Sequence, residues 1–451
     1  MKPLQVPLDQ MIQNLLNAKK YSSLRDMLII MNPADIASLF QDLPADSLPL
    51  LFRLLPKELA ADTFVEMDEE MQELLIQGFS DRELKEVIDE LYVDDAVDLV
   101  EEMPASVVKR ILRQAAPEMR KMINDILKYP EDSAGSMMTT EYVSLHPSMN
   151  VSQALARIRQ TGVDKETIYN CYVITQDRKL CGIVSARSLL LSSEHALIED
   201  IMESHVISVD TMMDQEEVAL MFNKYNFLAL PVVDQENRLV GIVTFDDAMD
   251  VLQEETTEDM EKMAAIVPSE RPYLKTGIFA TFRQRIPWLL VLMISATASS
   301  MIITAFEEAL AAQVALTAFI PMLMNTGGNS GSQASVTIIR GLSLNEIQYK
   351  DFFKVLWKEI RVGVLCGITL ATANYVKLLL FDRVSSLIAA AVCLTLVVTV
   401  ILSKIVGALL PMGAKKIGLD PAVMASPFIS TIVDVLSLLV YFQIATLLLG
   451  L

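Results

Sequence analysis

The segment SPFISTIVDVLSLLVY (residues 426–441) holds one carboxylate, Asp434, within an otherwise apolar run. The run from 422 to 450 is long enough to span a bilayer, and Asp434 falls about 18 Å along it, near the bilayer centre. An ionisable group at that depth costs roughly 2.5–3.5 kcal/mol, so its presence requires a reason. Asp434 is therefore the first functional candidate.

The neighbours of Asp434 suggest that reason. Polar side chains recur around it at helical spacing: Ser426, Ser430, Asp434, Ser437 and Tyr441. We interpret them as one polar helical face that lines a pore. The alternative is a structural tie between Asp434 and a neighbouring helix. Lys377 and Lys404 are poor partners for such a tie, because both are predicted near helix ends, where a lysine can extend to water.

A second apolar run contains the polar motif PMLMNTGGNSGSQAS (321–335). Its proline and glycines predict a broken or loosened helix. Irregular backbone is tolerated at membrane depth only where protein buries it or where it lines a wet cavity. Asn325, Asn329 and Gln333 share one helical face, which favours a cavity. Close helix packing through the glycines is the competing interpretation.

The C-terminal part of the chain is predicted to cross the membrane five times. The apolar stretches cover about 286–306, 309–339, 362–381, 385–410 and 422–450. Each approaches or exceeds the roughly 20 residues that a spanning helix needs. Basic residues flank the ends that would face the cytosol. We therefore expect a multi-pass protein of the plasma membrane, in contact with lipid, with a cytosolic N-terminus and an external C-terminus.

Charge divides the chain in the same way. Residues 1–270 hold 49 acidic and 23 basic side chains, whereas residues 271–451 hold 8 and 14. An acidic surface of this size is unsuited to nucleic acid, whose phosphates require basic patches. It suits cations as partners, although it also serves simply for solubility. We expect no enzyme, because no nucleophile–base pair or phosphate-binding glycine loop occurs outside the membrane runs.

Two repeats organise the acidic part. The segment DIASLFQDLPAD (35–46) matches DAVDLVEEMPAS (95–106), which predicts an all-α, solenoid-like N-terminal domain over 1–130. Residues 131–252 alternate strand-like and helical runs twice, with the cores KLCGIV and RLVGIV 59 residues apart. This second pattern resembles a tandem pair of CBS domains, which have an α/β fold.

A CBS pair implies two alternatives for ligand control. In this family a Thr/Ser-x-x-Asp motif after the GIV strand contacts the ribose of an adenine nucleotide. The second repeat keeps that motif as Thr244 and Asp247, whereas the first has Ser188 in place of the Asp. One site for ATP is therefore one alternative. A pair that dimerises and transmits strain without nucleotide is the other.

An acidic connector joins the soluble part to the membrane over 246–270. Its carboxylates recur at spacings of 3, 4, 4 and 3, on one helical face: Asp247, Asp250, Glu254, Glu258 and Glu261. The plain interpretation of such a stripe is a solvated face. Its position between two domains makes a cation-binding role the alternative.

The available ligands favour a hard cation. The membrane runs offer a carboxylate, amides, hydroxyls and backbone carbonyls, and the three histidines lie outside them. Oxygen-only surroundings suit Mg²⁺ or Ca²⁺ better than Zn²⁺ or Cu⁺. A two-fold homodimer would bring two Asp434 side chains together, and a divalent cation between them would relieve their repulsion.

The order of these parts, together with PMLMNTGGNSGSQAS and LDPAVMASPFISTIVDVLS, resembles the MgtE family of magnesium channels over the whole chain. The resemblance implies a multi-domain fold: a superhelical all-α N-terminal domain, a CBS pair, a connecting plug helix over 246–270 and a five-helix all-α transmembrane domain over 271–451. It implies a homodimer with its pore at the dimer interface. Pore residues for Mg²⁺ would be Asp434, Asp420 at the cytosolic mouth, and the polar Asn329 and Ser430.

The resemblance also implies a regulatory Mg²⁺ set. Its members are connector carboxylates and a cluster in the N-terminal domain: Asp247, Asp250, Glu255, Glu258, Asp259, Asp94, Asp95 and Asp98. Apposed acidic surfaces repel, and Mg²⁺ that bridges them would draw the soluble domains together and close the pore. The expected function is Mg²⁺ uptake with feedback inhibition by cytosolic Mg²⁺. The alternatives are a carrier that exchanges Mg²⁺ or Co²⁺ for Na⁺ or H⁺, and a membrane-anchored nucleotide sensor.

Overall fold

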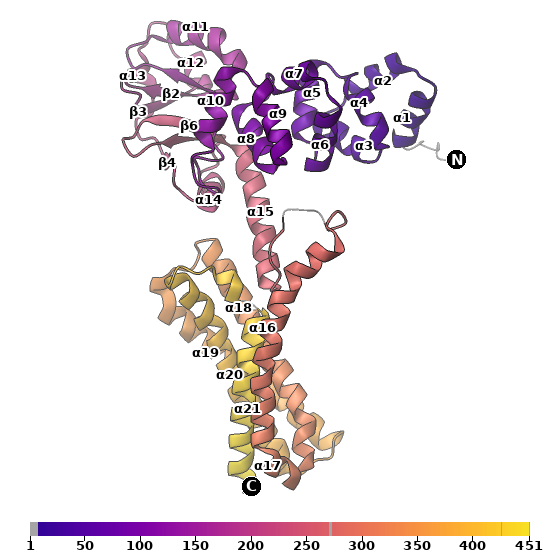
Figure 1. Ribbon diagram of the computed structural model, residues 1–451. Helices are drawn as coiled ribbons and strands as arrows, with labels where there is room; N and C mark the ends of the chain where they lie inside the picture. Colours follow the sequence, from indigo (N-terminus) through magenta and orange to yellow (C-terminus); the bar gives the residue numbers. More distant parts are fainter. Residues whose placement is uncertain (1–7, 270–272, 425, 451) are drawn as a thin grey trace, which may run out of the picture. The chain divides into compact units, whose positions relative to one another are not determined.

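The computed structural model describes residues 8–269, 273–424 and 426–450, and the chain forms two compact units that meet in sequence at Leu252 and Gln253 (Figure 1). Each unit is described by itself. The side chain of Ser426, which belonged to the predicted polar face, lies outside the described residues.

Short helices build the first part of the N-terminal unit. They are α1 (Leu8–Asn17), α2 (Tyr21–Leu28), α3 (Pro33–Gln41), α4 (Leu48–Phe52), α5 (Lys57–Val65), α6 (Glu69–Gly78), α7 (Asp81–Ile88), α8 (Val93–Glu102), α9 (Ala105–Gln114) and α10 (Pro117–Ile126). Local chemistry sets several starts: the side chains of Asn32, Asp68 and Ser80 accept backbone N–H groups at the beginnings of α3, α6 and α7. Buried apolar residues of successive helices form one continuous core, as expected of a solenoid.

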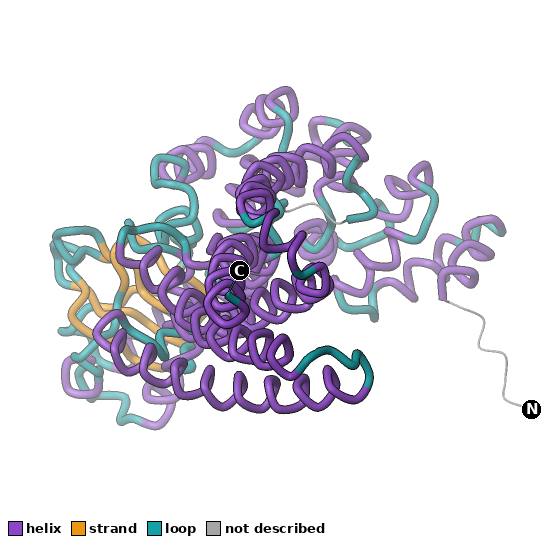
Figure 2. Tube along the Cα trace, turned by 90° about the horizontal axis from the view of Figure 1, so that it is seen from below, coloured by secondary structure: helices purple, strands orange, loops and turns teal. Residues whose placement is uncertain are grey.

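The second part of this unit contains two similar three-stranded sheets, which Figure 2 shows as the strand-bearing region. The first sheet has β1 (Tyr142–Leu145) parallel to β2 (Thr167–Ile174), and β2 antiparallel to β3 (Leu180–Ser185). The second repeats this topology with β4 (Val209–Asp210), β5 (Ala229–Val233) and β6 (Leu239–Thr244). Their helices are α11 (Val151–Thr161), α12 (Ala186–Leu191), α13 (Ile198–Ile201) and α14 (Gln215–Tyr225). The predicted tandem repeat is confirmed.

The acidic connector forms one helix, α15 (Phe245–Met263). It ends seven residues before the predicted limit of 270, at a turn in which Ala264 and Ala265 bond back to its last carbonyls. Its first residues belong to the N-terminal unit and its last to the C-terminal unit.

Long helices dominate the C-terminal unit. They are α16 (Ile278–Ala305), α18 (Ile320–Ser343), α19 (Phe352–Leu380), α20 (Ser386–Lys416) and α21 (Ser426–Leu449), with the short α17 (Glu307–Ala312) after α16. Among the described residues four spans are long and apolar enough to cross a membrane, those that contain α16, α19, α20 and α21. Helix α18, which carries the polar motif, is not among them, so a fifth crossing remains a prediction.

The expected break in the motif at 321–335 is wrong, because α18 is continuous from Ile320 to Ser343. Pro321 stands in the first turn, where its missing N–H costs no helical hydrogen bond. The glycines serve packing instead. A Cβ at Gly327 would lie 2.8 Å from Thr399 on α20 and 2.9 Å from Ser437 on α21, and one at Gly407 of α20 would meet the carbonyl oxygen of Gly331. The helix-packing interpretation of these glycines is therefore confirmed.

Candidate ion-binding sites

One face of α18 is polar and exposed while the opposite face is packed. Asn325, Asn329 and Gln333 are exposed, and Nδ2 of Asn329 donates to Oδ1 of Asn325 at 3.1 Å. The glycine side of the same helix is buried against α20 and α21. The three amides thus lie together on a helix surface that no described part of this chain covers.

Asp434 is half-buried on α21, and no ion pair or hydrogen bond involves it within the described part of the chain. The two basic residues considered as partners behave differently. Lys377 is 54% exposed and pairs with Asp382 at 3.0 Å, as expected of a residue near a helix end. The expectation that Lys404 reaches water is wrong: it is 5% exposed, because α20 continues twelve residues beyond it.

The prediction that Ser437 and Tyr441 line a pore together with Asp434 is also wrong. Ser437 and Tyr441 are buried inside the bundle, and the Tyr441 hydroxyl donates to the carbonyl of Leu316 at 2.9 Å. Ser430 lies half-buried beside Gly328, where a Cβ would come within 3.2 Å of its hydroxyl oxygen. The serines of α21 pack against α18 because Gly327 and Gly328 leave room for them. Helical spacing alone could not distinguish positions that face a pore from positions that pack against a neighbouring helix.

At one end of the C-terminal unit, Asp420 is paired with a lysine of the connector. Nζ of Lys262 lies 2.7 Å from Oδ2 of Asp420 and 2.7 Å from Oε1 of Glu258. Oδ1 of Asp420 accepts the backbone N–H of Ala422 at 2.8 Å. Partial burial lowers the pKa of Lys262, but its hydrogen bonds to Asp420 and Glu258 outweigh that effect and raise it overall. Lys262 is therefore a fixed positive charge at the predicted pore mouth.

Neighbouring contacts hold the end of α15 in place. The Ser343 hydroxyl donates to Oδ2 of Asp259 at 3.3 Å, and Met263 packs against Ile339 and Ala422. Burial, followed by the nearby charge of Asp420, raises the pKa of Asp259. Both Asp259 and Glu258, two of the predicted regulatory ligands, thus lie close to Asp420.

The other predicted ligands gather in the N-terminal unit. Asp94, Asp95 and Asp98 of α8 lie close enough to Asp247 of α15 for its charge to act on all three. Burial is the largest cause in each case. It raises the pKa of Asp94 well above the ordinary value, that of Asp95 to about 7 and that of Asp247 to about 6. The pKa of Asp98 is raised as well, although its side chain keeps contact with solvent.

Two further carboxylates, Glu141 and Glu166, complete this acidic cluster. Burial, then the charges of Asp95 and Asp247, raises the pKa of Glu166 to about 8, and its Oε2 has no hydrogen-bond partner among the described residues. Glu141 accepts the backbone N–H of Val93 at 3.0 Å, which ties the CBS part to the start of α8. Neither residue could be predicted as a site residue, because both lie outside the acidic stripes.

The cluster is suited to a hydrated cation. Within the ranges that the structure describes, no three His, Cys, Asp or Glu side chains form a ready-made coordination site. All its ligands are oxygen atoms, and Mg²⁺ dehydrates reluctantly and keeps several waters. Asp250 and Glu255 lie further along α15, and burial raises the pKa of Asp250. These residues fit an ion that bridges carboxylates through its water shell.

The nucleotide motif has an internal partner. The Thr244 hydroxyl donates to Oδ2 of Asp247, and the Ser185 and Ser188 hydroxyls pair at 2.9 Å. Asp247 also faces the charges of Asp246 and Asp250. The surroundings of Asp247 are therefore acidic and suit a cation.

An acidic unit with a CBS pair, followed by apolar helices around a carboxylate that has no ion pair among the described residues, is the arrangement expected of a multi-pass membrane protein that handles cations. Family models agree: "MgtE intracellular N domain" matches residues 31–132, the CBS domain matches 134–194 and 198–254, and "Divalent cation transporter" (MgtE) matches 320–444. The magnesium transporter MgtE of Thermus thermophilus is 35% identical over 97% of this chain and 98% of its own length. The chain belongs to the MgtE family of magnesium transporters, which are transport proteins and not enzymes.

Other relatives give the same result. The magnesium transporter MgtE of Bacillus subtilis is 32% identical over 96% of this chain and 95% of its own length. The crystal structure of the cytosolic domain of the Mg²⁺ channel MgtE in complex with ATP is 35% identical, with a TM-score of 0.52, over 54% of this chain and all of that one. The soluble part of a magnesium transporter is 30% identical with a TM-score of 0.51, over 55% of this chain and 97% of that one.

The acidic cluster predicts an unusual pH dependence. Unfolded Asp and Glu titrate near pH 4, and the folded pKa values of Asp95 and Glu166 are raised to about 7 and 8. Between these limits the folded state binds more protons than the unfolded state, so stability falls as pH rises from 5 to 8. We expect the melting temperature of the N-terminal unit, measured by scanning fluorimetry without divalent ions, to fall by several degrees.

Addition of Mg²⁺ at pH 8 should restore much of this loss. The variants Asp95→Asn and Glu166→Gln should flatten the pH profile, whereas Asp46→Asn on the exposed surface should leave it as in the wild type. A wild-type melting temperature that rises from pH 5 to 8 would show that the cluster is not destabilised by its own charge.

Proposed function

We propose that the chain is a Mg²⁺ channel formed by a homodimer in the plasma membrane, with the pore lined by the exposed amide face of α18 and by Asp434 of α21. The observation that carries this proposal is the exposed row of Asn325, Asn329 and Gln333 on a helix whose other face is packed. An amide face directed at lipid would be costly, and a second copy of the same face would form a polar path around a two-fold axis. Four long apolar helices support the membrane location.

Asp434 is the proposed ion-recognition residue of the pore. It has no protein counter-charge among the described residues, so a hydrated divalent cation between two copies would supply one. Asn329 and Ser430 are proposed to contact the water shell of that ion, and Asp420 to receive it at the cytosolic mouth. Their oxygen atoms suit Mg²⁺ and its slow exchange of water.

The channel is proposed to close when cytosolic Mg²⁺ binds to the soluble part. Carboxylates of the acidic cluster (Asp94, Asp95, Asp98 and Asp247) repel one another, and Mg²⁺ would relieve that repulsion. Asp250, Glu255, Glu258 and Asp259 extend this charge along α15. A cytosolic N-terminus places these groups in contact with the ion that the channel delivers. The transported ion then inhibits its own entry, as feedback regulation requires.

Asp434→Asn tests the pore. We expect the loss of one negative charge from each copy to lower Mg²⁺ flux by roughly tenfold or more, because about 1.4 kcal/mol of ion stabilisation corresponds to a factor of ten. Flux is measured with a Mg²⁺-sensitive dye in vesicles without any Na⁺ or H⁺ gradient. Asp382→Asn, which removes a carboxylate already paired with Lys377, is the matched control. Wild-type flux in Asp434→Asn would exclude this residue as the ion site, and flux only with a counter-ion gradient would favour a coupled carrier.

Lys262→Met tests the gate. The ion pair between Lys262 and Asp420 belongs to the closed state in this proposal, where the lysine holds the mouth carboxylate that Mg²⁺ needs. A partly exposed pair contributes up to about 1 kcal/mol, so the Mg²⁺ concentration for half closure should rise by about fivefold. Lys262→Arg should retain wild-type closure, and Lys109→Met on exposed α9 should have no effect. Equal or easier closure in Lys262→Met would remove the ion pair from the gate.

A further inference from the structure

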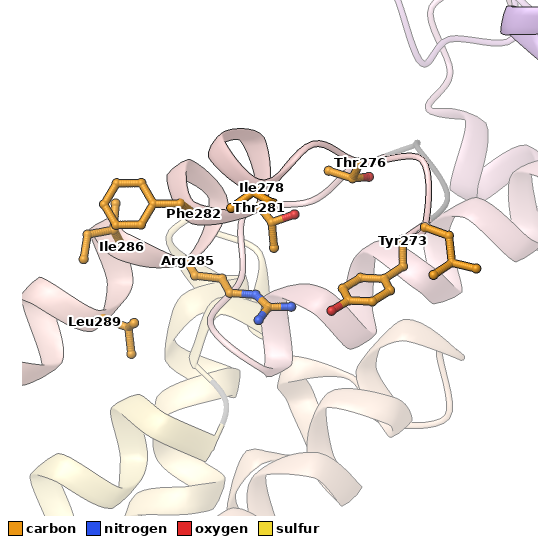
Figure 3. Close-up of a pocket in the computed structure, with 9 residues that line it drawn as sticks. Tyr273, Thr276, Ile278, Thr281, Phe282, Arg285, Ile286 and Leu289 are labelled. Carbon is orange, nitrogen blue, oxygen red and sulfur yellow. The ribbon is translucent and has the colours of Figure 1, made fainter.

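The start of α16 carries a pocket that the ion path does not use. It has a volume of about 480 Å³ and lies between the segment at Tyr273–Thr276 and one face of the helix (Figure 3). The helical residues of its wall follow one another at spacings of three and one: Ile278, Thr281, Phe282, Arg285, Ile286 and Leu289. The pocket therefore runs lengthwise along α16 for about three turns.

The walls of this pocket have two different characters. Arg285 extends its guanidinium toward the hydroxyl end of Tyr273, and the Thr281 hydroxyl lies between them and the helix start (Figure 3). The remaining wall is apolar, formed by Leu274, Ile278, Phe282, Ile286 and Leu289. One end thus offers the Tyr273 hydroxyl and the fixed positive charge of Arg285, whereas the Thr281 hydroxyl already donates to the carbonyl of Gly277 at 3.3 Å. The long side of the pocket is apolar.

Charge in this segment is of one sign only. Residues 273–289 contain Lys275, Arg283 and Arg285 and no acidic residue, in a protein whose net charge is −20. No ion pair to Arg285 occurs among the residues that the structure describes. The pocket is complementary to an anion. A free inorganic anion would leave the apolar side of the pocket without a partner.

The position of the pocket, at the start of a long apolar helix, indicates that the anion belongs to a lipid. Helix α16 is the first long apolar helix of the C-terminal unit, and almost all of its most apolar window is exposed in the single chain. Exposed aromatic residues and arginines at such a helix start are typical of the membrane–water boundary. Leu274 is 94% exposed, Ile278 86% and Phe279 83%, which is costly in water and favourable against acyl chains.

We propose that this pocket binds an anionic phospholipid, with the phosphate at Arg285 and Tyr273 and an acyl chain along Phe282, Ile286 and Leu289. The proposal rests on the membrane insertion of α16. The lipid would anchor the segment between α15 and α16, which links the proposed gate to the bilayer. Phosphatidylglycerol has the required chemistry, since its phosphate is anionic and its chains are apolar.

Trp288, next in sequence to Leu289, provides a probe. The chain has two tryptophans, so Trp357→Phe leaves Trp288 as the single fluorophore. The protein is reconstituted in vesicles of phosphatidylcholine and phosphatidylglycerol in which one lipid or the other carries bromine at the same mole fraction. Bromine quenches tryptophan on contact. We expect stronger quenching by brominated phosphatidylglycerol than by brominated phosphatidylcholine.

Arg285→Gln should lower the preference for phosphatidylglycerol by about fivefold, because a basic residue at an anionic surface contributes about 1 kcal/mol. Arg285→Lys should keep most of it. Arg361→Gln on α19 is the charge-matched control and should keep all of it; that guanidinium lies over Trp357, 5.8 Å from the ring centroid, in the native chain. Inorganic phosphate in the buffer should not compete.

Equal quenching by both lipids, or no quenching because a second protein copy covers the pocket, would overturn the proposal. Loss of the preference on addition of inorganic phosphate would assign the pocket to a soluble anion instead. The readout measures lipid contact and not ion flux, so a negative result leaves the channel proposal intact, and a failure of Mg²⁺ flux leaves this one intact.

Discussion

Repulsion between carboxylates that the fold crowds together is the constraint on which the N-terminal unit depends. Asp94, Asp95, Asp98, Glu166 and Asp247 are brought together by α8, the CBS part and α15, and each has a raised pKa because burial disfavours its charge. Their strongest electrostatic neighbours are other carboxylates. Such an arrangement is unfavourable near neutral pH unless protons or cations neutralise it. In the proposed function, the cation that neutralises this cluster is the ion that the family transports.

The two key carboxylates of the C-terminal unit differ in whether a basic side chain lies beside them. Asp420 has a protein cation, since Lys262 lies 2.7 Å from it, whereas Asp434 has none among the described residues. Lys262 would move away from Asp420 if the end of α15 moved. Whether the carboxylate of Asp420 is neutralised therefore depends on the position of α15. Asp434 is proposed to depend on a bound cation alone. One helix therefore connects the acidic cluster to the mouth of the proposed pore.

Much of this organisation could be predicted from the sequence. The tandem CBS repeat followed from the recurrence of KLCGIV and RLVGIV, and Asp434 was evident because a carboxylate is rare in an apolar run. Helical periodicity gave wrong predictions at positions whose exposure is set by packing against other helices. The helix α18 is continuous because its glycines fit tightly against α20 and α21, and Ser437 and Tyr441 are buried for the same reason.

Most partnerships between distant residues could not be predicted. Glu166 joins the acidic cluster through the fold of the CBS part, and Lys404 is buried because α20 is longer than its apolar stretch. Lys262 had a signal that sequence reasoning overlooked: it is the only basic residue between 246 and 270. A single opposite charge in a strongly acidic helix marks a place where that helix meets another carboxylate.

Carboxylate repulsion is proposed to push the helical part of the N-terminal unit away from the CBS part unless a divalent cation binds. The most direct test is the distance between spin labels at Lys109 and Lys179, both exposed, in full-length protein without its native cysteines. We predict one narrow distance distribution with Mg²⁺ and a broader, longer one without it, which Na⁺ at the same ionic strength does not reverse. The same distribution with and without Mg²⁺ would show that the cation does not hold the two parts together.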